Sequence, residues 1–160
     1  WLTEAREQGD RPRHGNYMYG TFGVDFVAGD GARVMVVALT GRQWQALCAA
    51  TGITDAAASV ATVLGTDFTD EAQRYEHREV LAALMRPWFA ARTGAEVADG
   101  LDAAGVLWSR YRRVSDVVAD LAAGRSSAVV ADVDQPGIGR MKNIWSRMSW
   151  PWFRSPSVRP

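Results

Sequence analysis

The sequence has little of the chemistry on which many enzymes depend. It contains one cysteine, Cys48, and two histidines, His14 and His77. One cysteine excludes a disulfide within the chain, and no Cys-x-x-Cys or His-x-x-His spacing occurs, so the sequence predicts no zinc site. It also lacks the Gly-x-Ser-x-Gly turn of many hydrolases and the Gly-x-x-x-x-Gly-Lys loop that binds nucleotide phosphates. We therefore expect no catalytic centre of these classes.

Net charge is also lacking, because 18 basic residues balance 18 acidic ones. The overall charge thus gives no indication of a nucleic-acid partner. No apolar run is long enough for a membrane span, and the polar segment 1–12 is unlike a secretory signal. Together with the lone cysteine, these absences favour a cytoplasmic protein.

The basic residues are concentrated near the end of the sequence. Segment 136–160 has no acidic residue, and its basic residues are Arg140, Lys142, Arg147, Arg154 and Arg159. Trp145, Trp150, Trp152 and Phe153 lie among them. We expect residues 141–160 to form a separate, irregular tail. Such a tail suits a membrane surface or a partner protein, but a truncated or frame-shifted end is the simpler interpretation.

The pattern of apolar residues predicts an α+β fold with a small, mainly antiparallel sheet. Residues 1–15 indicate an irregular lead-in, and Gly29-Asp30-Gly31 joins strands expected at 22–28 and 32–39 in a hairpin. The apolar run 34–39 predicts a strand covered on both faces. A later strand is expected at 106–111, and 128–133 is a final apolar segment that fits a strand or a helix.

Capping residues mark the expected helices. Thr40 and Gly52 bound a helix at 41–51, whose apolar stripe is Trp44, Leu47 and Cys48. Further helices are expected at 56–64, at 70–92 after a Thr69 cap, at 93–101 from the Thr93-x-x-Glu96 capping box, and at 115–123 after a Ser115 cap. Pro87 is expected to bend or divide the helix at 70–92.

The stretch Gly15–Gly23 is the most informative candidate site. Its glycines allow the backbone to approach a ligand closely, and its tyrosines offer flat, partly polar surface. By spacing alone, an ordinary glycine-rich lead into a hairpin is the more frequent explanation. The other candidates have structural interpretations: His77 as an exposed or half-buried helix residue, Cys48 as a buried thiol, and Arg110, Arg112 and Arg113 as a solvated strand edge and loop rather than an anion site.

Three blocks resemble the small domain of family III CoA-transferases. The first is Asp30–Ile53, in which Gln43-Trp44 and Leu47-Cys48 match the family pattern. The second is the Ala-Gly-Val block in Leu101–Asp120, and the third is the Pro-Gly element in Asp134–Gly139. The blocks follow the family order. Within the family, the segments 15–26 and 30–43 are most similar to the 2-methylfumaryl-CoA isomerases.

The resemblance implies a two-domain enzyme that forms interlocked dimers and moves CoA between carboxylates of an acyl-CoA thioester. A large domain, which nothing in this chain resembles, binds most of the CoA and carries an aspartate nucleophile. That aspartate forms an anhydride and then an enzyme-bound thioester. The small domain contributes a glycine-rich loop that covers the reacting group and excludes water.

On this resemblance we divide the chain into a lead-in (1–15), a small domain (16–140) and the tail (141–160). The residues expected near the substrate are Asn16, Tyr19, Gly20, Thr21 and Gly23. We assign no catalytic residue, no metal ligand and no cofactor bound by this chain alone; Asp25 is not taken as the nucleophile. CoA thioester is the expected substrate of the full enzyme, and this chain alone is expected to be inactive.

Two alternatives remain open at this stage. The chain could instead be a non-catalytic binding module that docks through its basic aromatic tail on a membrane or a protein. It could also be a decayed gene product without function. If the chain is instead a small domain without its large domain, the surface that would meet the large domain is left exposed, so self-association is expected.

Overall fold

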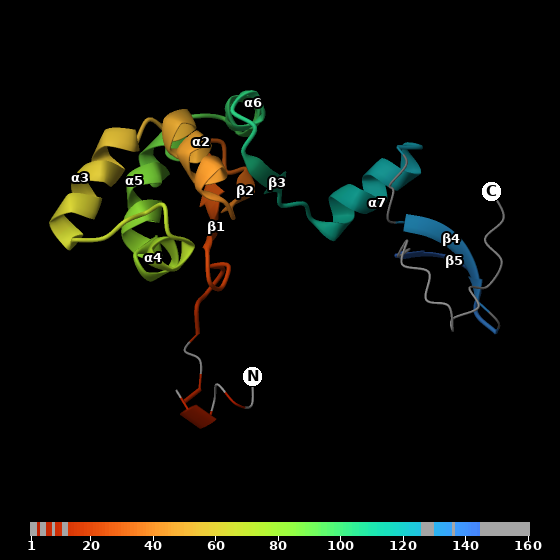
Figure 1. Ribbon diagram of the computed structural model, residues 1–160. Helices are drawn as coiled ribbons and strands as arrows, with labels where there is room; N and C mark the ends of the chain where they lie inside the picture. The colour runs from red at the N-terminus through yellow and green to blue at the C-terminus, as the bar shows by residue number, and fades with distance from the viewer. Residues whose placement is uncertain are drawn as a thin grey trace. The chain divides into compact units, whose positions relative to one another are not determined.

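A computed structural model describes residues 3, 6–7, 9–10, 13–125, 130–135 and 137–144. The chain divides into two compact units, residues 1–111 and 112–160. The first contains β1 (Phe22–Val27), β2 (Arg33–Ala38), α2 (Gly41–Thr51), α3 (Thr54–Leu64), α4 (Glu71–Glu76), α5 (Arg78–Ala90), α6 (Gly94–Ala103) and β3 (Leu107–Arg110). The second contains α7 (Val114–Ala122), β4 (Val130–Gln135) and β5 (Gly139–Ile144). The predicted α+β class is confirmed (Figure 1).

The predicted hairpin forms the centre of the first unit. β1 and β2 pair antiparallel with Val24 opposite Val36, and β3 pairs antiparallel with β2, which gives the order β1-β2-β3. β1 is therefore an edge strand. The turn uses Gly31 at φ 83°, a conformation that glycine adopts without strain. The Asp30 carboxylate accepts hydrogen bonds from the backbone N–H groups of Ala32 and Gly94, which ties the turn to the first residue of α6.

One face of the hairpin is buried and the other is only partly covered. Val34, Val36 and Ala38 are fully buried, whereas Met35 and Val37 are half-buried and Leu39 is exposed. The expected two-sided burial of this strand is therefore wrong for the described residues. The covered face meets α5, where the rings of Phe26 and Phe89 stack with their centroids 4.1 Å apart.

The helices gather on the buried side of this hairpin. Figure 1 shows α3, α4 and α5 on the same side of β1 and β2. α5 contributes a stripe of four fully buried side chains, Leu81, Ala82, Met85 and Phe89. Burying a side chain the size of leucine, methionine or phenylalanine stabilises a fold by about 1.5–3 kcal/mol. This packing holds β1, and the loop that leads into it, on a rigid support.

The single helix expected at 70–92 is two helices, and this corrects the prediction. The break falls at His77, between α4 and α5, whereas Pro87 lies inside α5 without dividing it. At the break, Arg78 Nη1 donates a hydrogen bond of 2.8 Å to the carbonyl of Tyr75, in the last turn of α4. The N-cap is also Asp70, which accepts from the N–H of Ala72, rather than Thr69.

Other boundaries agree with the sequence or differ slightly. α2 begins and ends as predicted, with the Thr40–Gln43 capping box, and the Thr93–Glu96 box is confirmed. α3 begins at Thr54, two residues early. The predicted Ser115 cap is wrong, because the N-cap of α7 is Arg113, whose backbone N–H is bonded by the carboxylate of Asp116.

In the second unit, the ambiguous segment 128–133 contains a strand. β4 pairs antiparallel with β5; Gly137 in the connecting turn and Gly139 at the start of β5 both have positive φ. β5 includes residues 141–144, the first part of the expected tail. Residues 145–160, with their tryptophans, lie outside the described residues.

Candidate functional site

The glycine-rich loop folds back on the strand that follows it. The N–H of Met18 donates a 2.8 Å hydrogen bond to the carbonyl of Gly23, and turns at Gly15 and Gly20 have φ of 62° and 80°. Segment 13–23 is called the glycine loop below. Its shape is thus fixed by backbone hydrogen bonds and by glycine conformations at the two turns.

The glycines of this loop have different physical roles. Gly20 lies at positive φ with open space around it, so only its backbone conformation requires glycine. Gly23 has no such φ, but a Cβ atom there would lie 2.9 Å from Cβ of Met18 and 3.4 Å from Cγ2 of Val37. At Gly23 glycine is required because the loop packs directly on the strand.

Side-chain hydrogen bonds anchor both ends of the glycine loop. Asn16 Nδ2 donates to Asp25 Oδ1 and to the Tyr111 hydroxyl, each at 2.7 Å. Thr21 is buried, and its hydroxyl donates to the carbonyl of Ala38 at 3.0 Å. These contacts give Asn16 and Thr21 positioning roles, which the sequence motif alone did not indicate.

Tyr19 belongs to a ring cluster that the sequence analysis missed. Its ring lies 5.5 Å from the ring of His14 and 5.2 Å from that of Tyr75, and it is 51% exposed. The Tyr75 hydroxyl lies 2.7 Å from Nδ1 of His14. The Arg78 guanidinium stacks 4.5 Å from the Tyr75 ring. The only signal in the sequence is the i, i+3 spacing of Tyr75 and Arg78 on a predicted helix.

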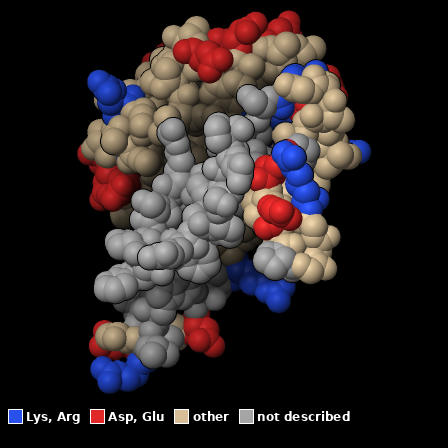
Figure 2. Space-filling model, turned by 90° about the vertical axis from the view of Figure 1, so that its right-hand side faces the viewer, with Lys and Arg blue, Asp and Glu red and all other residues tan. Residues whose placement is uncertain are grey.

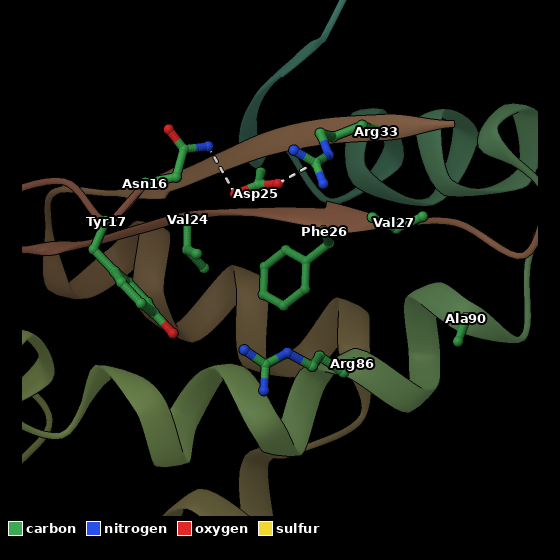
Figure 3. A pocket seen from close by; sticks show the side chains of 9 residues that line it. All are labelled: Asn16, Tyr17, Val24, Asp25, Phe26, Val27, Arg33, Arg86 and Ala90. Carbon is green, nitrogen blue, oxygen red and sulfur yellow. Dashed lines mark hydrogen bonds and ion pairs between the residues drawn. The ribbon is translucent and has the colours of Figure 1, made fainter. Parts of the chain in front are cut away.

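A pocket of about 440 Å³ opens beside the glycine loop at the free edge of β1 (Figure 3). It is lined by Asn16, Tyr17, Val24, Asp25, Phe26, Val27, Arg33, Arg86 and Ala90. Asp25 Oδ2 lies 3.1 Å from Nε of Arg33, and its Oδ1 accepts from Asn16. Burial, and then the negative charge of Glu79, raise the pKa of the Tyr17 hydroxyl, which donates to Glu79 Oε2 at 3.2 Å. The Tyr17 phenol therefore stays protonated at neutral pH.

The remaining candidates behave as the sequence predicts. Cys48 is 4% exposed, and burial raises the pKa of its thiol to about 12, so it is not a nucleophile at neutral pH. His77 is half-buried against the ring of Phe68. Arg110, Arg112 and Arg113 are exposed.

The described residues show neither a metal-binding group nor a membrane-spanning helix. They include no group of three His, Cys, Asp or Glu side chains that could hold a metal. Within the same residues no one helix is long and apolar enough to cross a membrane; α2 and α3 reach that threshold only as a pair bent by 120°. In Figure 2, acidic and basic side chains are interspersed over the described part of the visible face. The candidate site therefore consists of the glycine loop and an adjacent pocket with both polar and apolar lining residues.

Comparison with known proteins places these features in a family. The family model for CoA-transferase family III matches residues 1–157. The 2-methylfumaryl-CoA isomerase of Chloroflexus aurantiacus is 48% identical over 131 residues, which cover 81% of this chain and 32% of that protein. The chain thus spans about a third of the length of that relative.

Solved structures share the fold at low sequence identity. A CAIB/BAIF family protein from Brucella suis superposes with a TM-score of 0.58 at 20% identity, covering 98% of this chain and 40% of that one. The protein Rv3272 from Mycobacterium tuberculosis gives a TM-score of 0.56 at 18% identity, covering 99% of this chain and 39% of its own. In both, the matched region is a minor part of a longer chain.

Proposed function

This chain belongs to CoA-transferase family III, and we propose that it forms the small-domain part of an enzyme that moves CoA between the two carboxylates of a dicarboxylic acyl thioester. Its relative from Chloroflexus aurantiacus is named as an isomerase of such a thioester, 2-methylfumaryl-CoA. The observation that carries this proposal is the combination of 48% identity to that relative with a glycine loop anchored on a rigid hairpin. The remaining part of such an enzyme would supply the nucleophile.

The proposed reaction has four balanced steps. An aspartate outside this chain attacks the thioester carbonyl, which breaks the C–S bond, releases CoA thiolate and forms a mixed anhydride. The thiolate then attacks the aspartyl carbonyl, giving an enzyme thioester and a free acyl carboxylate. The other carboxylate of the same acid attacks this thioester, which breaks its C–S bond, releases CoA thiolate again and forms a second anhydride. Attack of the thiolate on the acyl carbonyl gives the isomeric thioester and restores the aspartate.

Within this scheme the glycine loop has a protective task. Anhydrides react readily with water, so a cover that excludes solvent decides between transfer and hydrolysis. Gly20 presents backbone without a side chain, and Tyr19 presents an exposed ring beside it. We therefore propose that Tyr19 and Gly20 lie over the reacting group, with Asn16, Thr21 and Gly23 holding the loop in shape.

Reconstitution tests this function. The chain is co-expressed with the large domain of the Chloroflexus relative, and 2-methylfumaryl-CoA carrying ¹³C in one carboxyl carbon is followed by NMR. The proposal predicts that the labelled carbon changes from a thioester to a free carboxylate in the complex and in neither part alone. Turnover by the isolated chain, or a folded complex that only hydrolyses the thioester, would contradict it.

A non-catalytic binding module is the second candidate. The exposed apolar residues of α7, Val114 at 80% and Val118 at 59%, favour a surface that meets another polypeptide. In this alternative, deletion of residues 141–160 abolishes binding of the chain to vesicles or to a partner. Unchanged binding after the deletion would eliminate it.

A further inference from the structure

The pocket beside β1 has an unbalanced positive charge. Its acidic residue, Asp25, is already bound by Arg33 and by Asn16. The second arginine, Arg86, forms no hydrogen bond or ion pair with any residue that the structure describes. The pocket therefore contains one matched ion pair and one further guanidinium.

Arg86 is directed into the pocket. It projects from α5, and Figure 3 shows its guanidinium pointing to the space between Tyr17 and Phe26. The pocket volume of about 440 Å³ lies within the range of small-molecule sites. Because Tyr17 belongs to the glycine loop, a molecule held by Arg86 would lie next to the loop that we propose to cover the reaction.

The walls of the pocket define the class of ligand. Val24, Phe26 and Val27 supply apolar surface that suits a short carbon skeleton. A guanidinium binds a carboxylate through two parallel hydrogen bonds. The Asp25 carboxylate on the same wall, and Glu79 next to Tyr17, disfavour by repulsion a phosphate, which concentrates its negative charge on one group, whereas a carboxylate carries a single charge.

From this arrangement we propose that Arg86 binds the carboxylate of a small organic acid in the pocket between β1 and α5. This proposal deepens the proposed function and rests on it for one detail, namely that the ligand is the free carboxylate of the dicarboxylic acyl group. Arg86 is then a specificity-determining residue: it would select acyl groups with a second carboxylate, and it would not take part in breaking or forming the thioester.

Direct binding to the chain tests the pocket. 2-Methylfumarate and, separately, inorganic phosphate are titrated into the ¹⁵N-labelled 160-residue chain, and the Nε–H signals of its arginines and the amide of Tyr17 are followed by NMR. We expect 2-methylfumarate to shift Arg86 and Tyr17 with one common saturation curve, and Arg86→Gln to weaken this binding at least about tenfold. Phosphate is expected to bind much more weakly.

Two further variants serve as a control outside the pocket and as a substitution that keeps the charge. Arg42→Gln removes an exposed arginine of α2 outside the pocket and should leave binding unchanged. Arg86→Lys keeps the charge but loses the paired hydrogen bonds, so it should bind more weakly than the natural chain and more tightly than Arg86→Gln. Because Arg86 is exposed, its variants should retain the native amide spectrum. Equal binding by the natural chain and folded Arg86→Gln, or stronger binding of phosphate, would overturn the proposal.

The reconstituted enzyme separates this proposal from the proposed function. If the complex isomerises 2-methylfumaryl-CoA and Arg86→Gln leaves KM unchanged, the pocket assignment fails and the function stands. If the chain binds 2-methylfumarate through Arg86 but the complex does not isomerise, the function fails and the carboxylate site stands.

Discussion

The amide of Asn16 joins the start of the glycine loop to the strand that follows it, because Nδ2 of Asn16 lies 2.7 Å from Oδ1 of Asp25. The same nitrogen also donates to the hydroxyl of Tyr111, 95 residues later in the chain. One side chain therefore links the loop, the edge strand β1 and the segment after β3. This connection makes the position of the loop depend on the whole sheet.

Asn16→Ala should loosen the glycine loop without unfolding the domain. The variant loses two hydrogen bonds at an exposed site, so the free energy of unfolding should fall by about 1 kcal/mol. Hydrogen exchange measured by mass spectrometry should become faster in residues 14–21 and stay unchanged in α5. Gln45→Ala, an exposed change on α2, is the control. Unchanged exchange in the loop would show that Asn16 does not anchor it.

Gly20 and Gly23 in the glycine loop should respond differently to alanine. Gly20→Ala forces a side chain into positive φ and should cost about 1 kcal/mol of stability. Gly23→Ala introduces a steric clash with Met18 and should cost about 2 kcal/mol. Adding Met18→Gly removes the clashing Cβ atom, so the double variant with Gly23→Ala should show a favourable coupling energy in urea unfolding. The combination of Met18→Gly with Gly20→Ala removes no clash and should show a much smaller coupling energy. Additivity in both cases would contradict this description of the loop.

Arg74 should be a structural residue whose loss is costly. It is 1% exposed, and its guanidinium donates to the carbonyls of Leu39, Phe68 and Thr69, joining the end of β2 to the segment before α4. Burial lowers the pKa of Arg74, whereas the negative charges of Glu71 and Asp70 act against this shift. Arg74→Met leaves the carbonyls without a donor and should lower the free energy of unfolding by about 3 kcal/mol.

The matched control for Arg74 is Arg42→Met, an exposed change on α2. It should alter the free energy of unfolding by less than about 0.5 kcal/mol. Similar effects of the two substitutions in urea unfolding would show that the buried guanidinium contributes little.

The thiol of Cys48 should make stability depend on pH in alkaline solution. Burial raises the pKa of the thiol in the folded chain to about 12, whereas the pKa of a cysteine in an unfolded chain is about 8.5. Between these values the unfolded chain binds fewer protons, so stability falls as pH rises, by up to about 1.4 kcal/mol per pH unit. Below the unfolded pKa this contribution is fully present.

Cys48→Ala isolates this effect, because the variant lacks the thiol but keeps every other titrating group. The natural chain should be more stable than Cys48→Ala at pH 7, since the substitution leaves a cavity. The difference between their free energies of unfolding should shrink from pH 9 to pH 11. A difference that is constant over this range, or rapid alkylation of the folded chain at pH 8, would show that the thiol is accessible.

The parts of the fold that the sequence predicted are those with local causes. The hairpin is predicted by Gly29-Asp30-Gly31, and α2 is predicted by its N-cap Thr40 and by Gly52 at its end. Each of these signals lies within a few residues of the element that it predicts. The break at His77 and the burial of Arg74 depend instead on contacts with distant carbonyls and rings. No periodicity within the segment 70–92 indicates them.

The candidate site divides in the same way. The glycines at 15, 20 and 23 form a recognisable motif, because they lie close together in the sequence. Arg86 was not identified, since its place in the pocket depends on α5 packing beside β1. The ring cluster of Tyr19 with His14 and Tyr75 likewise requires the folded chain.

Hydrogen exchange of the glycine loop in the reconstituted enzyme tests the central claim most directly. The claim is that this loop covers an acyl group whose nucleophile lies outside the chain. Addition of 2-methylfumaryl-CoA should slow the exchange of residues 18–23 strongly in the complex and much less in the isolated chain. If instead the loop exchanges at the same rate with and without substrate in an active complex, it does not cover the reaction and the account is wrong.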